Sequence, residues 1–82
     1  MVDFNVSVST TSTQVLPADS NRLEAFIYND SSFQVVYISL NTTAASGVGV
    51  RLNPGQSWST KNKSVVNAIT TAGTANIIGS TS

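Results

Sequence analysis

The chain contains no cysteine and no histidine, and it carries only four basic and four acidic residues among 82. Without cysteine, disulfide bonds and thiolate metal sites are excluded as means of stabilising so short a chain. Without histidine, the side chain that most often acts as a general base near neutral pH is missing. The length predicts one domain over residues 1–82. Association with further copies is the remaining way to add buried surface.

The few charges cancel, which gives a formal net charge of zero at pH 7. A protein that binds nucleic acid needs clustered lysine and arginine to displace counterions from phosphates. A protein that lies on a membrane typically carries a basic amphipathic helix. The sequence shows neither pattern, so we expect neither nucleic acid nor a membrane as partner. The basic residues are Arg22, Arg51, Lys61 and Lys63, and the acidic residues that balance their charge are Asp3, Asp19, Glu24 and Asp30.

Long hydrophobic runs are also missing. The longest, such as Val35–Ile38, are far too short to cross a bilayer. The segment Met1–Asn5 has neither the basic start nor the continuous apolar stretch of a signal peptide. We therefore expect a protein that is not secreted through a signal peptide.

Catalytic chemistry is disfavoured by elimination. Serines are plentiful, but a serine nucleophile needs a base, and only Lys61 and Lys63 could act as one. Both lysines lie in a polar stretch, so we expect them to be solvated and not activated as bases. Asp19 and Asp30 lie in predicted turns, where a carboxylate typically caps nearby backbone. These carboxylates and Asn29 are oxygen ligands of the type that calcium takes, but they lack the spacing of an EF-hand. We expect no enzyme, no metal and no cofactor.

Strand and turn signals cover most of the chain. Apolar and polar residues alternate over 2–8, so residues 1–13 are expected to form a short N-terminal arm or an edge strand. Asn53-Pro54-Gly55-Gln56 predicts a type II turn, because its third position needs a positive φ. The pattern predicts an all-β chain, a small antiparallel β-sandwich or barrel of about seven short strands. Further strands are expected over 22–29, 34–41, 48–52, 57–59, 65–70 and 74–78.

Two of these strands, 22–29 and 34–41, carry apolar side chains on both faces, whereas a half-exposed sheet should be polar outside. We expect the two to be neighbours. One interpretation is that the chain's own N-terminal segment or its 42–49 loop covers the outer face. The other is that this face is an oligomer interface, since aromatic residues are enriched at such contacts. The residues of that predicted interface are Phe26, Tyr28, Val35 and Tyr37.

Trp58 is the only tryptophan and follows the predicted turn. An exposed indole there, with Tyr28 or Tyr37 as companion, would stack on a sugar ring and make the domain a carbohydrate-binding or adhesive module. The alternative is that Trp58 anchors an otherwise aliphatic core, and we favour this interpretation.

The stretch Arg22…Ile27-x-Asn29-x-Ser31…Val36-Tyr37-Ile38, followed by Leu52-x-Pro54-Gly55-x-Ser57, resembles small all-β accessory proteins of tailed-bacteriophage virions. These are head decoration (cement) proteins and fibre-base domains. The resemblance covers residues 22–57 and consists of strand and turn residues. It implies a capsid-surface protein without an active site, often a trimer, that bridges neighbouring capsomers.

The hypothesis from the sequence is therefore a non-enzymatic capsid decoration protein on the virion surface, assembled in the host cytoplasm. Its partners would be other copies of itself, as a homotrimer, and the major capsid protein or another virion protein. Arg51, with Thr42 and Thr43 in the polar loop 42–49, is the weaker candidate for particle contact. Arg22 either pairs with Glu24 or with backbone carbonyls of a facing chain, or is a solvated arginine.

Overall fold

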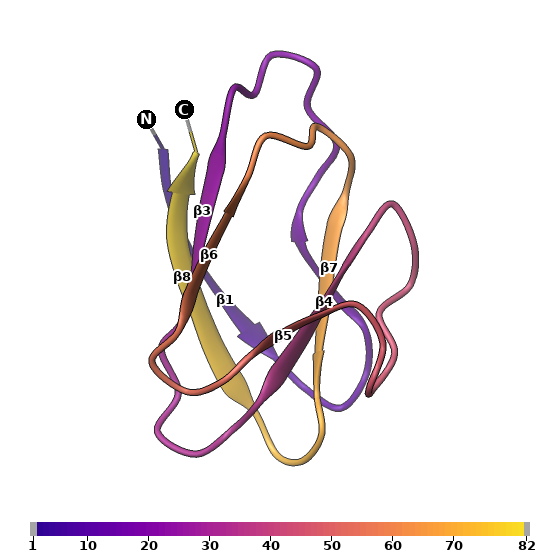
Figure 1. Ribbon diagram of the computed structural model, residues 1–82, viewed down its shortest axis with the longest axis vertical. Coiled ribbons are helices and arrows are strands. Elements are labelled where there is room, and N and C mark those ends of the chain that lie inside the picture. Colours follow the sequence, from indigo (N-terminus) through magenta and orange to yellow (C-terminus); the bar gives the residue numbers. More distant parts are fainter. Residues whose placement is uncertain (1, 82) are drawn as a thin grey trace.

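The computed structural model describes residues 2–81 and shows an all-β protein (Figure 1). Within this range no helix is long and apolar enough to span a membrane. Eight strands alternate with loops along the chain. They are β1 (Val2–Val8), β2 (Thr13–Leu16), β3 (Ala25–Asn29), β4 (Val36–Leu40), β5 (Val50–Leu52), β6 (Ser57–Thr60), β7 (Val66–Thr70) and β8 (Ala75–Thr81).

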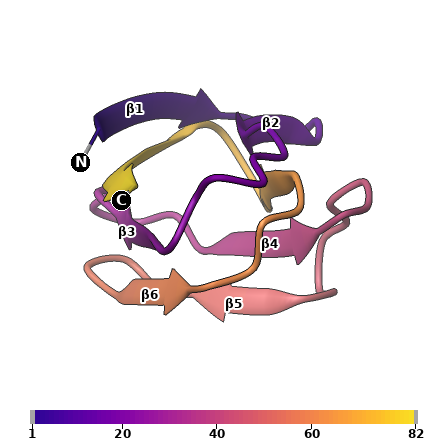
Figure 2. The ribbon, with the colours of Figure 1, turned by 90° about the horizontal axis from the view of Figure 1, so that it is seen from above.

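The strands form two four-stranded antiparallel sheets, in the orders β1-β8-β3-β6 and β2-β7-β4-β5. The sheets stack face to face (Figure 2). Successive strands pass from one sheet to the other, and only the β4–β5 hairpin stays within a sheet. This connectivity is that of an eight-stranded jelly roll, in which each sheet takes strands from both halves of the chain.

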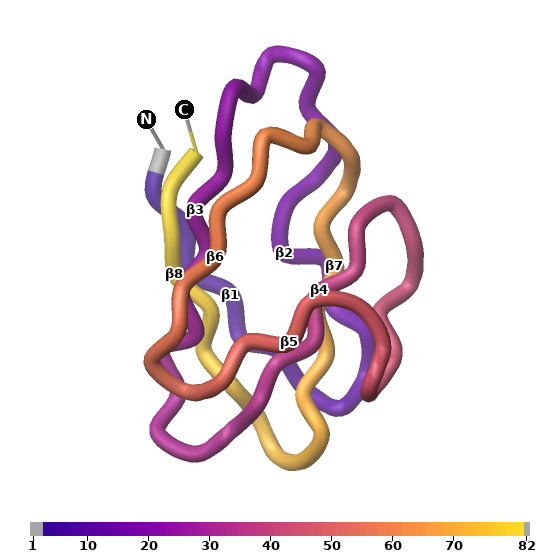
Figure 3. The backbone as a smooth tube through the Cα atoms, viewed as in Figure 1, coloured from indigo at the N-terminus to yellow at the C-terminus, as the bar shows by residue number. Residues whose placement is uncertain are grey.

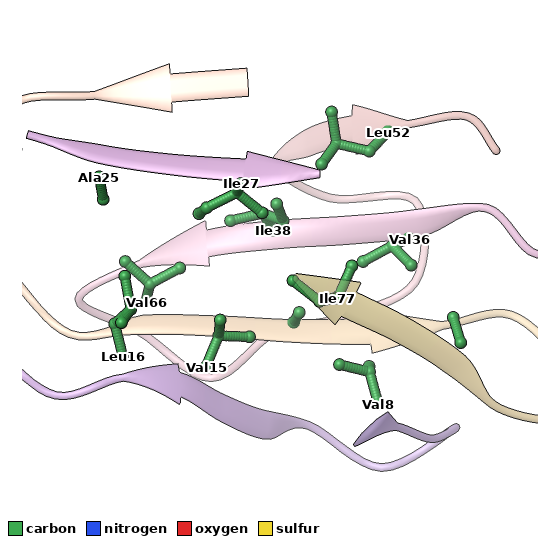
Figure 4. Packing of buried hydrophobic residues seen from close by; sticks show 12 residues of the cluster. Val8, Val15, Leu16, Ala25, Ile27, Val36, Ile38, Leu52, Val66 and Ile77 are labelled. Atoms are coloured by element: carbon green, nitrogen blue, oxygen red, sulfur yellow. The ribbon is translucent and has the colours of Figure 1, made fainter. Parts of the chain in front are cut away.

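The core lies between the sheets and is aliphatic. Period-two alternation turns one side of each strand inward, so that Ile27, Ile38 and Ile77 are almost completely buried (Figure 4). Partly buried side chains, Phe4 and Trp58 among them, pack against this cluster. The buried cluster consists of Val8, Val15, Leu16, Ala25, Ile27, Val36, Ile38, Leu52, Val66, Ala68, Ala75 and Ile77.

The predicted fold class is confirmed, but the strand count and one adjacency differ. Thr13–Leu16, for which the sequence predicts no separate strand, is a strand that pairs with β7 through a register irregularity between Gln14 and Leu16. The predicted neighbours 22–29 and 34–41 correspond to β3 and β4, which lie in opposite sheets. That prediction is wrong because the short β3–β4 loop crosses the sandwich instead of folding back as a hairpin.

The predicted turn at 53–56 carries the chain from β5 to β6, and therefore from one sheet to the other. The Gln56 amide donates to the Asn53 carbonyl at 3.0 Å, and Gly55 has a φ of 79°. Both features are those of a type II turn.

Replacing Gly55 with alanine is expected to cost about 1 kcal/mol of unfolding free energy, because an L residue is strained at positive φ. A Cβ at this position would lie 3.9 Å from the Tyr28 hydroxyl, an ordinary contact, so backbone strain is the main cost. Urea unfolding of Gly55→Ala measures this loss of unfolding free energy, with Ser57→Ala, a change at an exposed neighbouring residue, as the control. Equal stability of the two variants would contradict the assignment.

Arg22 fastens the loops at one end of the sandwich. Its side chain is 3% exposed, and the guanidinium donates to the carbonyls of Pro17 at 3.0 Å, Asn62 at 2.7 Å and Ser64 at 2.7 Å. These carbonyls belong to the β2–β3 and β6–β7 connections, which run side by side at the top of Figure 3. Of the interpretations from the sequence, solvation is wrong, and the acceptors are carbonyls of the same chain.

Asn29 joins the loops at the opposite end of the sandwich through hydrogen bonds. Its side chain is completely buried, and its Nδ2 donates to the Gln34 carbonyl at 2.8 Å and the Leu52 carbonyl at 3.0 Å. Its backbone amide donates to the Gln56 carbonyl, and its carbonyl accepts from the Gly55 amide. One residue thus ties the end of β3 to the approach to β4 and to the β5–β6 turn across the sandwich.

Candidate functional site: a groove on the outer face of one sheet

The outer face of the β1-β8-β3-β6 sheet presents two rows of side chains. Because Ala25, Ile27 and Asn29 of β3 are buried, the intervening Phe26 and Tyr28 point away from the core. The strand register places residues from all four strands beside these rings. The first row is Asn5, Ile78, Tyr28 and Ser57, and the second is Asp3, Ser80, Phe26 and Ser59.

A shallow groove of about 730 Å³ lies over these rows. The exposed surface of its walls is mainly apolar, and Phe26 is 44% exposed. The groove is lined by Asp3, Phe4, Asn5, Phe26, Tyr28, Ile78, Gly79 and Ser80.

Gly79 allows the strands beneath the groove to pack closely. A Cβ on this residue would overlap the Phe26 carbonyl and lie 2.8 Å from Cζ of the Phe4 ring. The Phe4 ring fills the space that a side chain at 79 would take, and it packs against the core. The floor of the groove is therefore held by close contacts between β1, β8 and β3.

The arrangement has an apolar centre and polar margins. Phe26, Tyr28 and Ile78 occupy the two middle strands, whereas β1 on one side and β6 on the other contribute polar residues. An apolar centre with a polar rim is the usual anatomy of a protein-binding surface. The charge is low, since Asp3 is the only ionisable group in the two rows apart from the Tyr28 phenol.

The four residues of the predicted interface do not form one patch. Phe26 and Tyr28 lie on the outer face just described. Tyr37, between the buried Val36 and Ile38, faces outward from the other sheet, and Val35 precedes the same strand. We predicted from the sequence that β3 and β4 are neighbouring strands. Because they lie in opposite sheets, Phe26 and Tyr28 are separated from Val35 and Tyr37. An interface role for each pair stays a prediction.

The structure places Trp58 on the core side of β6. It pairs in register with the buried Ile27, and its partly buried ring packs against the core cluster. This supports the core interpretation from the sequence over the exposed indole that stacking on a sugar would require.

The weaker candidates for particle contact lie on the other sheet and at its end. Arg51 is exposed on the edge strand β5, where its Nε donates to Asn53 Oδ1 at 3.1 Å. Thr42 and Thr43 are exposed after β4, and the Thr42 carbonyl accepts from Asn67 Nδ2 at 2.7 Å. None of these residues lines the groove, which lies on the β1-β8-β3-β6 sheet, and a contact role for them stays a prediction.

Sequence reasoning missed the contribution of β8 and β1 to this surface. Ile78 follows Ile77 directly, so one of the two isoleucines had to face outward from the strand. That doublet was the available signal. Its position beside Tyr28 could not be read from the sequence, because the two residues are 50 positions apart and meet only through the pairing of β3 with β8.

Among residues 2–81 there is no group of three or more acidic, histidine or cysteine side chains that could hold a metal ion. Comparison with protein-family models, with curated proteins and with solved structures gives no match for this chain.

Proposed function

We propose that this protein is a non-enzymatic structural component that works by self-association through the outer face of the β1-β8-β3-β6 sheet. The observation that carries the proposal is the contiguous apolar cluster of Phe26, Tyr28 and Ile78 that lines an open groove. Burying these side chains against another protein surface would remove apolar area from water, which is the main driving force of association.

A second copy is the partner that the charge pattern favours. Two such faces can approach each other without strong repulsion, because only Asp3 is charged in the two rows and the chain is neutral overall. The polar margins supplied by Asn5, Ser57 and Ser59 offer neutral donors and acceptors to a facing surface.

The finer proposal is a capsid decoration or cement protein on a virion surface, present as a homotrimer. It rests on the resemblance over residues 22–57. Many residues of that pattern form the framework: Arg22 and Asn29 are buried hydrogen-bonding residues, Ile27 is in the core, and Gly55 forms the turn. The pattern thus supports a shared framework, and the jelly roll is a fold that viral capsid proteins use.

Substitution of Phe26 with serine is expected to weaken self-association at least tenfold, because truncating an aromatic hot-spot residue at an interface costs about 2 kcal/mol and about 1.4 kcal/mol is a factor of ten. Folding should be little affected, since the ring points away from the core. Sedimentation equilibrium over a range of concentrations measures the association constant. The matched control is Tyr37→Ser, the same kind of change on the opposite sheet.

An unchanged association constant in Phe26→Ser would overturn the use of this face, as would an equal loss in Tyr37→Ser. Co-sedimentation of the chain with capsids of tailed phages tests the finer proposal. Binding that Phe26→Ser or Arg51→Ala reduces would support it, and absence of binding to every capsid tested would count against it.

A second candidate is carbohydrate binding in the groove. The specific observation is that two rings, Phe26 and Tyr28, line the same groove as Asp3 and Asn5. Aromatic faces pack on the apolar faces of sugars, while such polar groups bind hydroxyls. Titration of soluble oligosaccharides monitored by NMR shifts of these residues tests it. Shifts confined to the groove would favour binding of sugars over self-association.

A further inference from the structure

The edge strands of the sandwich differ in length. Edge positions are held by β1 and β6 in one sheet and by β2 and β5 in the other. Of these, β1 has seven residues, and β2, β5 and β6 have four, three and four. All seven residues of β1 pair with β8 in continuous register. Over the described part of the chain, β8 is the only strand that pairs with it, so its other side presents unpaired backbone N–H and C=O groups.

This edge lacks the devices that usually prevent strands from pairing with other chains. Soluble proteins protect sheet edges with proline, lysine, bulges or very short strands. The sequence of β1 is VDFNVSV, with neither proline nor lysine, and its only charge is Asp3. In Figure 2, β1 forms the outer margin of the molecule on its side. A long, regular edge of this kind is a template for another strand.

We propose that β1 pairs with β1 of a second copy in antiparallel register about a two-fold axis at Asn5. This pairing goes beyond the face contact proposed above: it is a second, edge-to-edge contact between two copies, and it leaves the groove face free. In this register Asn5 faces Asn5 of the second copy, Phe4 faces Val6, and Asp3 faces Ser7. Polar side chains therefore meet polar ones on the outer face, apolar meet apolar on the inner face, and the two Asp3 carboxylates are kept apart.

The match follows from the symmetry of the strand. Antiparallel pairing about any residue of an alternating strand keeps both faces consistent, and an axis at Asn5, the central residue of VDFNVSV, is the one that pairs all seven residues. The β1-β8-β3-β6 sheets of the two copies would become one sheet of eight strands. The axis is perpendicular to this sheet, so the grooves of both copies would lie on the same side and form one wider surface.

A charge at position 5 tests the register. Asn5 is exposed, so Asn5→Lys should fold normally, but it would place two lysines directly opposite each other. We expect the dimer dissociation constant to rise about fivefold. Mixing Asn5→Lys with Asn5→Asp should restore association, because opposite charges would then face each other. The control Gln14→Lys makes the same charge change at an exposed position on the edge strand β2.

Cysteine substitution tests the same register covalently, since the natural chain contains no cysteine. With oxidised glutathione as oxidant, two thiols of Asn5→Cys would form an intermolecular disulfide, because residues opposite each other in paired strands have neighbouring Cβ atoms. Ser7→Cys, whose opposite residue is Asp3, should cross-link poorly alone. It should cross-link well when mixed with Asp3→Cys.

The outcomes separate this inference from the proposed function. One outcome is that Phe26→Ser weakens self-association while Asn5→Lys and Gln14→Lys associate as strongly as the natural chain. This result would overturn the β1 contact and leave the proposed contact through the groove face intact. Equal cross-linking of Asn5→Cys and Ser7→Cys would overturn the register. A natural chain that remains an 8.6 kDa monomer at millimolar concentration would overturn both.

Discussion

Substitution of Arg22 with alanine is expected to lower the free energy of unfolding by about 4 kcal/mol. The guanidinium is buried and donates to three carbonyls that belong to two separate loops. Alanine would leave these carbonyls without a donor and open a void between the loops. Since small domains are stable by only about 5–15 kcal/mol, the loss would be a large share of the total.

Chemical denaturation of Arg22→Ala, Arg22→Lys and Arg51→Ala measures this effect. Lysine keeps the charge, but its single ammonium group cannot replace the planar fork of donors from two guanidinium nitrogens, so we expect it to recover only part of the loss. Arg51 is exposed, and its removal should change stability by less than about 0.5 kcal/mol. An Arg22→Ala variant as stable as Arg51→Ala would show that the loops do not depend on the buried guanidinium.

Substitution of Asn29 with alanine should cost about 3 kcal/mol, through loss of the two hydrogen bonds to Gln34 and Leu52 at a site without access to water. Asn29→Asp should cost more at pH 7. It keeps the shape of the side chain but replaces the donor with a carboxylate oxygen that would face both carbonyls.

Thermal and urea unfolding of both Asn29 variants, with Asn21→Ala as the exposed control, provide the measurement. Amide hydrogen exchange at the start of β4 and in the 53–56 turn adds a local readout, because Asn29 joins these segments. Stability of Asn29→Asp equal to that of the natural chain would disprove the role of the amide as a donor.

Local signals in the sequence predicted most of the strands and the turn. Period-two alternation identified β1, and the Pro-Gly pair placed the positive φ at Gly55, because both depend on a few adjacent residues. The strand β2 was not predicted, because its four residues are too few to show an alternating pattern after a polar tract. The hydrogen-bond partners of Arg22 could not be predicted either, because Asn62 and Ser64 are 40 and 42 positions away in the sequence.

The candidate site was half predicted. Phe26 and Tyr28 were identified because apolar residues stood at outward positions of a strand. They were wrongly joined to Val35 and Tyr37, since adjacency in sequence suggested a hairpin where the chain crosses between sheets. The other residues that line the groove, Ile78 among them, come from β1 and β8, the strands at the two ends of the chain.

By itself the sequence determined an all-β chain with an aliphatic core and few charges, because strand periodicity, turn residues and composition act over short distances. Only the tertiary structure decided which strands are neighbours, and with them the groove and the free edge of β1. In a jelly roll nearly every pairing joins strands that are distant in the sequence. Their order follows from how the two sheets bury a common core, which no local pattern encodes.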